Sequence, residues 1–207
     1  MSRALPSAQL ETAVSHLRKR DRRMRKVIER VGPCKMKRDP RHFAMLARSI
    51  VAQQISTTVA RVIWGRLEDL VGNGDISAES LGRLTPTKLR TIGVSNQKSR
   101  YLLDLADKVN EGLIEFRSLN RRSDEEIIEG LTQVKGIGVW TAQMYLIFSL
   151  GRLDVFPWND LGVRTQMQRI YGLTELPGKE ESHSIAEAWR PYASVASWYC
   201  WRHGDLG

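Results

Sequence analysis

The sequence has few cysteines and no long apolar run. Its two cysteines, Cys34 and Cys200, lie far apart, and neither belongs to a C-x-x-C motif or a four-cysteine cluster. This pattern excludes a zinc ribbon and an iron–sulfur cluster, and it favours reduced thiols over a disulfide. No apolar stretch reaches the roughly 18 residues of a membrane-spanning helix, and the N-terminus has no signal-peptide pattern. We therefore expect an intracellular protein, in the cytoplasm or nucleoid, or in the nucleus of a eukaryotic cell.

The chain also lacks an alternating strand pattern and the residue sets of several enzyme classes. Apolar residues recur at helical spacing instead, which predicts an all-α fold of about ten short helices. There is no Ser-His-Asp set, no metal-binding cluster and no P-loop. If the protein is an enzyme, the chemistry that remains is a single carboxylate acting with water.

Positive charge is in excess. The 207 residues include 32 Lys+Arg against 23 Asp+Glu, a formal charge of +9. This balance favours a polyanionic partner, most simply nucleic acid, although many basic proteins do not bind DNA. The run R-K-R-D-R-R at residues 18–23 is open to two interpretations, a solvated helix face or a direct DNA contact.

The stretch from residue 124 to residue 169 carries the most information. Ser123 or Asp124 can cap a short helix, with Glu126 in its first turn. The tight turn V-K-G-I-G follows at residues 134–138, and a second apolar helix begins near Val139. Two helices joined in this way form a helix-hairpin-helix, and the N–H groups that open the second helix can hold a phosphate. Glycine is common in such turns, so plain structural packing is the alternative.

Residues that typically start or interrupt helices predict where the other elements of the chain lie. Residues 1–6 are expected to be frayed, and residues 35–40 to form a linker. Ser56 and Pro86 mark helix starts, since serine is a frequent N-cap and proline suits the first helical position. The helices are predicted near residues 7–31 (interrupted), 43–51, 57–71, 77–81, 86–91, 96–109, 161–171, 182–190 and 191–202, with a short helix or turn at 113–119.

Asp160, at the start of one of these helices, is the leading candidate for chemistry. An aspartate there is most often only an N-cap, but capping and catalysis are compatible because a cap holds the carboxylate still. A carboxylate beside a sugar that develops positive charge stabilises it and can orient water, which suits cleavage of a glycosidic bond. At about 4 Å and an effective dielectric near 20, the attraction is roughly 4 kcal/mol. That corresponds to roughly three decades in rate.

Aromatic and amide side chains add two weaker indications. Tryptophans cluster in the last third of the chain, where they suit either a core or a pocket that stacks an extruded base: Trp140, Trp158, Trp189, Trp198 and Trp201. Gln53, Gln54 and Ile55 at a helix end are either surface residues or a wedge that fills the gap left by a flipped base.

Several of these segments together resemble a known family. They are I-V-A-Q-Q-I-S (50–56), the G-x-S-x-x-K element with Y-L-L-D-L-A (93–106), V-K-G-I-G-V-W-T-A (134–142), D-V-F-P-W-N-D-L-G-V-R (154–164) and the segment W-R-P-Y to W-Y-C-W-R (189–202). In order and spacing they are similar to the helix-hairpin-helix Gly/Pro–Asp superfamily of DNA glycosylases, in its compact alkylpurine (3-methyladenine) branch. The resemblance covers about residues 40 to 203.

The resemblance implies roles for individual residues. Asp160 corresponds to the catalytic aspartate, and Asn159 replaces a first, non-catalytic acid of many relatives. Trp140 stands where glycosylase/lyases carry their Schiff-base lysine, which implies a monofunctional enzyme that uses water. Together with the aromatic cluster, it implies a base pocket of Trp140, Met144, Trp201, Trp158 and Trp198. The expected DNA contacts are Gln53, Gln54, Ile55, Ser56, Lys98, Lys135, Gly136, Ile137, Gly138, Thr141 and Arg164.

The resemblance also implies an organisation and partners. It implies two helical lobes with a DNA-binding cleft: N-terminal helices 1–40 packing with the C-terminal lobe, a lobe 41–155 containing the hairpin (131–142), and a lobe 156–207 with the catalytic aspartate. No cofactor and no iron–sulfur cluster are expected. A sodium or potassium ion is implied at the carbonyls of Thr132, Val134 and Gly136. The expected activity is removal of alkylated purines from double-stranded DNA by a monomer that flips the base. The alternatives are a non-catalytic DNA-binding module, a glycosylase for oxidised purine or uracil, and an inactive scaffold.

Overall fold

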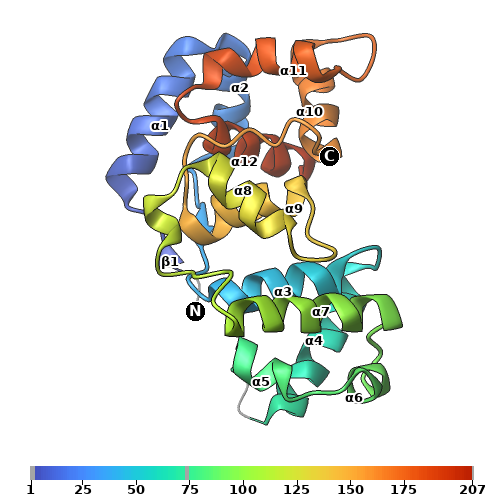
Figure 1. Cartoon of the computed structure of the whole chain (residues 1–207). Helices are drawn as coiled ribbons and strands as arrows, with labels where there is room; N and C mark the ends of the chain where they lie inside the picture. Colours follow the sequence, from blue (N-terminus) through green and yellow to red (C-terminus); the bar gives the residue numbers. More distant parts are fainter. Residues whose placement is uncertain (1–2, 73–74, 207) are drawn as a thin grey trace. The chain divides into compact units, whose positions relative to one another are not determined.

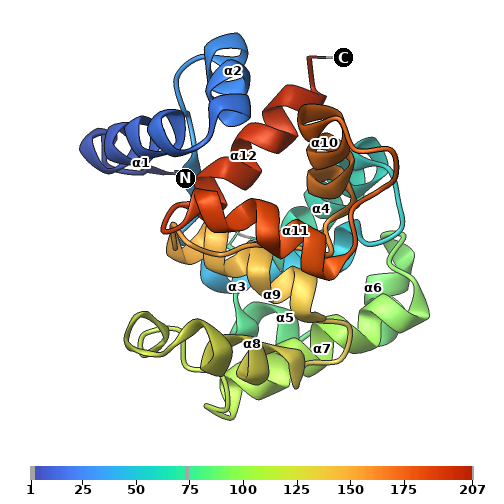
Figure 2. The same ribbon diagram turned by 90° about the horizontal axis from the view of Figure 1, so that it is seen from above.

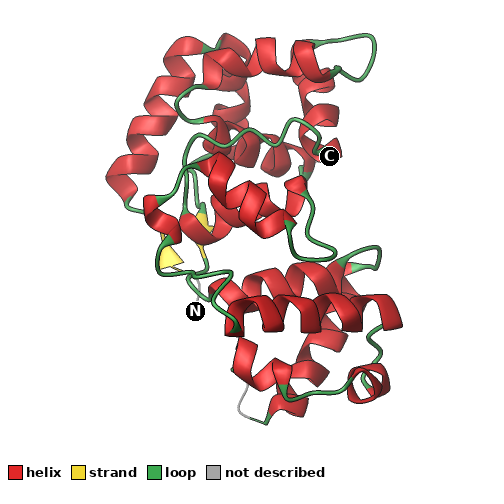
Figure 3. Cartoon of the chain, viewed as in Figure 1, coloured by secondary structure: helices red, strands yellow, loops and turns green. Residues whose placement is uncertain are grey.

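The computed structural model describes residues 3–72 and 75–206, and over this part of the chain the fold is all-α, as predicted (Figure 3). The chain divides into two compact units. The terminal unit combines the chain up to Pro40 with the chain from Leu146 onward, and the central unit runs from Arg41 to Tyr145. Figure 1 shows both segments of the terminal unit, blue at the start of the chain and orange to red at its end.

The terminal unit contains five α-helices among its described residues. They are α1 (Ser7–Arg20), α2 (Arg22–Val31), α10 (Leu161–Tyr171), α11 (Lys179–Ala186) and α12 (Ala193–Gly204), with a π-helix at Leu146–Leu150 and a 3-10 turn at Glu187–Trp189. Helix α12 packs against both α2 and α10 (Figure 2). Fully buried side chains such as Leu17, Met24, Trp189 and Tyr199 fill the core of this unit. The unit therefore holds the last helices of the chain against the first.

The central unit contains the remaining helices. They are α3 (His42–Ala52), α4 (Thr57–Val71), α5 (Ala78–Gly82), α6 (Pro86–Thr91), α7 (Asn96–Asn110), α8 (Asp124–Thr132) and α9 (Val139–Tyr145), with a 3-10 turn at Leu119–Arg121. Helix α3 packs on α4, α7 and α9, and α8 packs on α9. The core includes Leu46, Ile50, Leu102 and Leu105, all fully buried.

Side-chain caps explain where several helices begin. The Asp21 carboxylate accepts hydrogen bonds from the N–H groups of Arg23 and Met24, so the predicted interruption of the first helix is a cap that starts α2. Ser56 caps α4 and Ser95 caps α7 in the same way. Ser123 and Glu126 form a reciprocal capping box at α8, which decides between the two predicted caps, Ser123 and Asp124.

One expectation about the N-terminus was wrong. Arg3–Ala4 (β1) pairs antiparallel with Lys37–Arg38 (β2), so these residues are neither frayed nor part of an irregular linker. The pair is only two residues long, which is too short for an alternating pattern to reveal it. Among the described residues, no helix is both long enough and apolar enough to cross a membrane.

Candidate active site and nucleic-acid interface

The central unit contains the predicted helix-hairpin-helix, formed by α8, the turn at residues 133–138 and α9. Ile127 and Leu131 are buried and anchor α8. Gly136 has a φ of 84°, a left-handed backbone conformation that residues other than glycine rarely adopt. The chain continues from α9 directly into the π-helix at Leu146–Leu150.

Three side chains of the central unit contact this turn, those of Gln53, Asp104 and Tyr101. The Gln53 amide donates a 2.7 Å hydrogen bond to the carbonyl oxygen of Gly136. The backbone N–H of Lys135 donates to the Asp104 carboxylate at 2.9 Å. The Tyr101 ring lies so close to Gly136 that a Cβ there would be 2.1 Å from its Cδ2 atom. Gly136 is thus required by the protein's own packing as well as by its φ.

Gly138 differs from Gly136 in both respects. Its φ is not positive, and no atom lies within 4 Å of the position that a Cβ would take. The fold itself therefore does not need glycine at the residue before α9. The bare backbone there leaves room for a group from outside the chain, which is the arrangement that a phosphate at a helix start requires.

Asp104 is a part of this site that sequence reasoning missed. Burial opposes its ionisation, but hydrogen bonds from the Lys108 ammonium and the Lys135 N–H, with the charges of both lysines, hold the pKa of Asp104 below its usual value. The Lys108 ammonium lies 2.9 Å from the carboxylate. Tyr101 and Asp104 are three residues apart on α7, so one helix face supplies both supports, and this spacing is the signal that could have revealed them.

In the terminal unit, Asp160 is the N-cap of α10. Its Oδ1 accepts a 2.8 Å hydrogen bond from the backbone N–H of Val163 and a 3.0 Å bond from the indole N–H of Trp201. The residue is 9% exposed, so the carboxylate is held almost entirely within the unit. A Cβ on Gly162 would lie 3.2 Å from the same Oδ1 and 3.4 Å from Cδ1 of Trp201. The carboxylate is therefore fixed in orientation by the cap and the indole, and the lack of a side chain at Gly162 leaves room for both.

The predicted pocket aromatics separate into different environments. Trp201 contacts Asp160 and also Phe148, whose ring centroid lies 5.5 Å away. Lys179 lies over the ring of Trp158, and Arg202 lies over that of Trp198. Phe148 was missed because one phenylalanine in an apolar helix looks like any core residue.

Trp189 belongs to the core and not to a pocket. It is fully buried, and its indole N–H donates to Asp21 and to the Tyr171 hydroxyl. Of the two interpretations offered for the tryptophans, the structure bears out the core for Trp189, because a fully buried indole cannot stack on a ligand. In the central unit, Trp140 is 43% exposed while Met144 is 8% exposed.

Several predicted DNA-contact residues use their side chains inside their own unit. Lys98 donates to the carbonyl of Val51 at 2.8 Å, and burial lowers the pKa of its ammonium. Arg164 donates through Nε to the carbonyl of Pro177 at 2.8 Å. Ile137 and Thr141 are buried, so their side chains are not available to a nucleic acid.

Gln54 is the most exposed of the predicted wedge residues. It has a φ of 55°, a conformation that is uncommon for residues other than glycine. Ile55 beside it is half-buried, and the Ser56 hydroxyl caps α4. Such local strain is typical of residues that a function holds in place.

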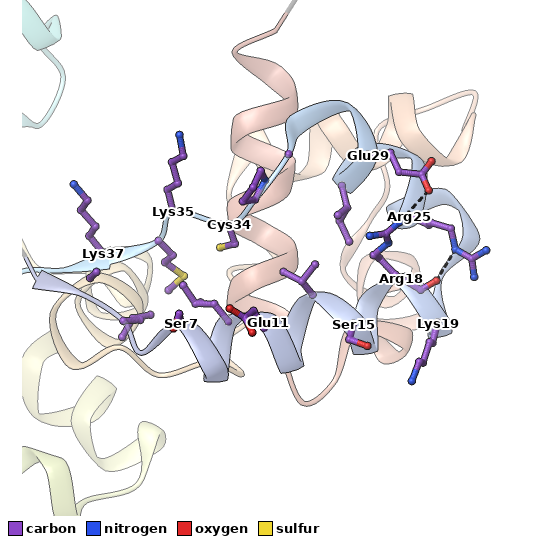
Figure 4. Close-up of a pocket in the computed structure, with 18 residues that line it drawn as sticks. Ser7, Glu11, Ser15, Arg18, Lys19, Arg25, Glu29, Cys34, Lys35 and Lys37 are labelled. Carbon is purple, nitrogen blue, oxygen red and sulfur yellow. Dashed lines mark hydrogen bonds and ion pairs between the residues drawn. The ribbon is translucent and has the colours of Figure 1, made fainter.

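A cavity of about 1160 Å³ lies in the terminal unit, but it is not this site. It runs along α1 and is closed by residues of α2 and by the segment from Gly32 to Lys37 (Figure 4). None of the predicted site residues lines it. Cys34 does, and burial raises the pKa of its thiol to about 11. Both cysteines are free, and in the described part of the chain no group of three or more His, Cys, Asp and Glu residues could hold a metal ion.

Comparison with known proteins identifies the family of the chain. The family profile of the HhH-GPD superfamily of base excision DNA repair proteins matches residues 47–191. The protein belongs to this superfamily, in the branch of the DNA-3-methyladenine glycosylases.

Individual relatives cover nearly the whole chain. DNA-3-methyladenine glycosylase 1 of Schizosaccharomyces pombe is 32% identical over 95% of this chain and 89% of its own length. The crystal structure of a Bacillus halodurans DNA-3-methyladenine glycosidase superposes with a TM-score of 0.86 at 37% identity, covering 94% of this chain and 90% of that one. The S. pombe 3-methyladenine DNA glycosylase bound to abasic DNA superposes with a TM-score of 0.83 at 32% identity, covering 92% and 95%.

Proposed function

We propose that the protein is a monofunctional DNA glycosylase that hydrolyses the N-glycosidic bond of alkylated purines in double-stranded DNA. One observation carries the proposal: Asp160 is immobilised by the Val163 N–H and the Trp201 indole in a chain that belongs to a base-excision superfamily. The relatives named as 3-methyladenine glycosylases support the choice of alkylated purines.

The reaction asks little of the protein beyond electrostatics. A purine alkylated at ring nitrogen N3 or N7 is cationic and leaves readily, so the bond to the sugar breaks with positive charge developing on the sugar. The carboxylate of Asp160 stabilises that charge and orients the water that completes the hydrolysis. Because its hydrogen bonds to Val163 and Trp201 are already formed, the carboxylate needs no reorganisation as the charge develops.

The hairpin and the α3–α4 loop hold the DNA. The backbone N–H groups around Gly138 bind phosphates beside the lesion, with Lys135 as a further cation. Gln54, exposed at the end of the loop, fills the space that the flipped base leaves, with Ile55 beside it. The extruded base contacts side chains that each unit supplies separately, Trp140 and Met144 in the central unit and Trp201, Trp158 and Trp198 in the terminal unit. An aromatic side chain stacked on the base gains a cation–π attraction when the base is cationic.

Trp140 also determines what the enzyme does not do. An indole offers no amine for a Schiff base, so the enzyme leaves an abasic site and does not cut the strand. Base release without strand cleavage is therefore the expected product pattern.

A monovalent cation fits the hairpin carbonyls. Each carbonyl oxygen has two lone pairs, and those of Val134 and Gly136 each accept one hydrogen bond, from the Ile137 N–H and from Gln53. With Thr132 they would hold sodium or potassium, which adds a positive charge for a DNA phosphate.

We propose that the protein acts as a monomer.

A panel of oligonucleotide duplexes tests the proposed function. Each duplex carries a single lesion, which is 3-methyladenine, 7-methylguanine, hypoxanthine, ethenoadenine, 8-oxoguanine or uracil. The expected result is release of the free alkylated base, with strand breaks appearing only after alkaline treatment. Release of only 8-oxoguanine or uracil would assign another lesion class. Binding of the duplexes without release of any base would identify a non-catalytic DNA-binding module.

A further inference from the structure

The net charge of the chain is confined to one short segment. Residues 18–38 contain 11 of the 32 Lys+Arg and 2 of the 23 Asp+Glu, a net charge of +9. The rest of the chain has 21 of each and is neutral. All the excess positive charge that makes the protein basic therefore lies at the end of α1, on α2 and in the segment that follows.

Within this segment, α2 carries a row of cations on its outer face. Arg22, Lys26 and Arg30 are spaced four residues apart, so they lie above one another on the helix, and all three are exposed. Among the described residues, none of the three has a side-chain hydrogen bond or an ion pair. The row is thus a set of solvated charges with no structural partner.

The row destabilises α2 at its first turn and through repulsion between its members, although Arg30 in the last turn lies at the favourable end of the helix dipole. Like charges four residues apart on a helix repel, and cations in a first turn oppose the positive end of the helix dipole. The first turn of α2 contains no acid, and only the Asp21 cap offsets its two arginines. A destabilising arrangement with no internal partner indicates a ligand outside the chain.

The positive surface continues onto the C-terminal end of α10. Arg23 donates to the carbonyl of Ile170, which places this part of α2 against the end of α10. Burial and the charges of Arg30 and Arg169 lower the pKa of His203 on α12, which shows that both arginines lie near that ring. Asp160 is at the opposite end of α10, and a helix of 11 residues is about 16 Å long.

We propose that Arg22, Lys26 and Arg30, with Arg169, form a second DNA-binding surface that contacts the phosphate backbone of the duplex away from the lesion. This inference rests on the proposed function, since it takes DNA as the partner. The distance along α10 between this second surface and Asp160 corresponds to about five base-pair steps of 3.4 Å. The surface adds affinity for any sequence and no selectivity for the damaged base.

An acidic segment of a partner protein fits this surface less well. Affinity between proteins comes mainly from apolar and aromatic anchors in pockets, and the row on α2 contains only cations. The cavity along α1 has other cations in its lining. Two of these cations have partners within the chain, since Arg18 pairs with Glu29 at 3.4 Å and Arg25 donates to the carbonyl of Arg18 (Figure 4). Arg22, Lys26 and Arg30 do not line that cavity.

The test replaces the three cations with glutamine, Arg22→Gln, Lys26→Gln and Arg30→Gln together. The matched control replaces three exposed arginines of the central unit, Arg61, Arg117 and Arg121, by the same residue and so removes the same charge. Binding to an undamaged duplex is measured as a function of salt. The slope of log K against log salt should fall by about 2 to 3 in the α2 variant, since each lost phosphate contact removes about 0.9.

Two further readouts separate DNA contact from a structural role. The melting temperature of the α2 variant should be equal to or above that of the wild type, because repulsion has been removed. In the wild type, the pKa of His203 followed by NMR should rise when duplex is added, because phosphates offset the charges of Arg30 and Arg169.

The proposal would be overturned if the slope of log K against log salt were unchanged in the α2 variant, or if the control variant lowered it equally. It would also be overturned if the pKa of His203 did not change when duplex is added. A variant that binds DNA normally but loses affinity for a poly-glutamate probe would overturn it as well. Loss of the slope in a protein that releases no base from any lesion would refute the proposed function and leave the second surface standing.

Discussion

The indole N–H of Trp201 donates to the same oxygen of Asp160 that caps α10, so one carboxylate oxygen joins two helices of the terminal unit. Replacing Trp201 by phenylalanine keeps an aromatic ring beside Phe148 but removes this hydrogen bond. A hydrogen bond to a charged group contributes about 1.5–3 kcal/mol, so single-turnover base release should slow about tenfold or more. Trp201→Phe releasing base at the wild-type rate would show that the bond does not position the carboxylate.

Gly162→Ala should impair catalysis without weakening the fold. The added methyl group would press on Oδ1 of Asp160 and on Trp201, at 3.2 and 3.4 Å. Alanine is favoured over glycine in a helix by up to about 1 kcal/mol, so thermal stability should be unchanged or slightly higher. Base release and melting temperature measured on the same preparation test this. A parallel loss of both would mean that the substitution disturbs α10 itself.

The two hairpin glycines should respond differently to alanine. Gly136→Ala meets a positive φ and the Tyr101 ring, so it should lower the free energy of unfolding by about 2 kcal/mol or more. Gly138→Ala has open space and an ordinary φ, so stability should change by less than about 0.5 kcal/mol while DNA affinity falls.

Urea unfolding and duplex binding, measured for both variants, check this contrast. Gly138→Ala is the informative member, because its methyl group would stand where a phosphate approaches. Wild-type DNA affinity in that variant would exclude the residue from the interface.

Asp104→Asn should reveal the anchor of the hairpin through its pH dependence. The folded-state pKa of Asp104 is below the reference value of 3.8, so the stabilisation it provides is fully present above that value and is lost as the pH falls through the folded pKa. Wild type should exceed the variant by about 1 kcal/mol between pH 5 and 8, and the gap should close below about pH 4. A gap that does not depend on pH would mean that the carboxylate charge is not what holds Lys135.

Much of the fold was predictable because helix starts are local. Ser56 and Asp160 cap the helices at whose starts they were expected, since capping depends on a few adjacent residues. The β1–β2 pair and the burial of Trp189 were not predictable in this way. Both depend on partners far along the chain, Lys37–Arg38 in one case and Asp21 in the other.

The sequence suggested candidate site residues but not the hydrogen bonds between them. Asp160, Trp201 and Gly136 were expected to be functional, but neither the indole bond to Asp160 nor the Gln53 bond to Gly136 follows from spacing. These contacts join residues 41 and 83 positions apart. The different roles of Gly136 and Gly138 were also invisible, because one letter in a G-x-G motif does not reveal which φ is positive or which Cβ position is blocked.

The most direct test of the account is Asp160→Asn, which keeps the size of the side chain and removes its charge. Asparagine can still accept the bonds from Val163 and Trp201, so the variant should fold and bind an alkylated duplex with nearly wild-type affinity. Release of the alkylated base should fall by roughly a thousandfold, the loss expected for about 4 kcal/mol of electrostatic stabilisation. Base release at the wild-type rate by a folded, DNA-binding Asp160→Asn protein would contradict the assignment of Asp160 as the catalytic carboxylate.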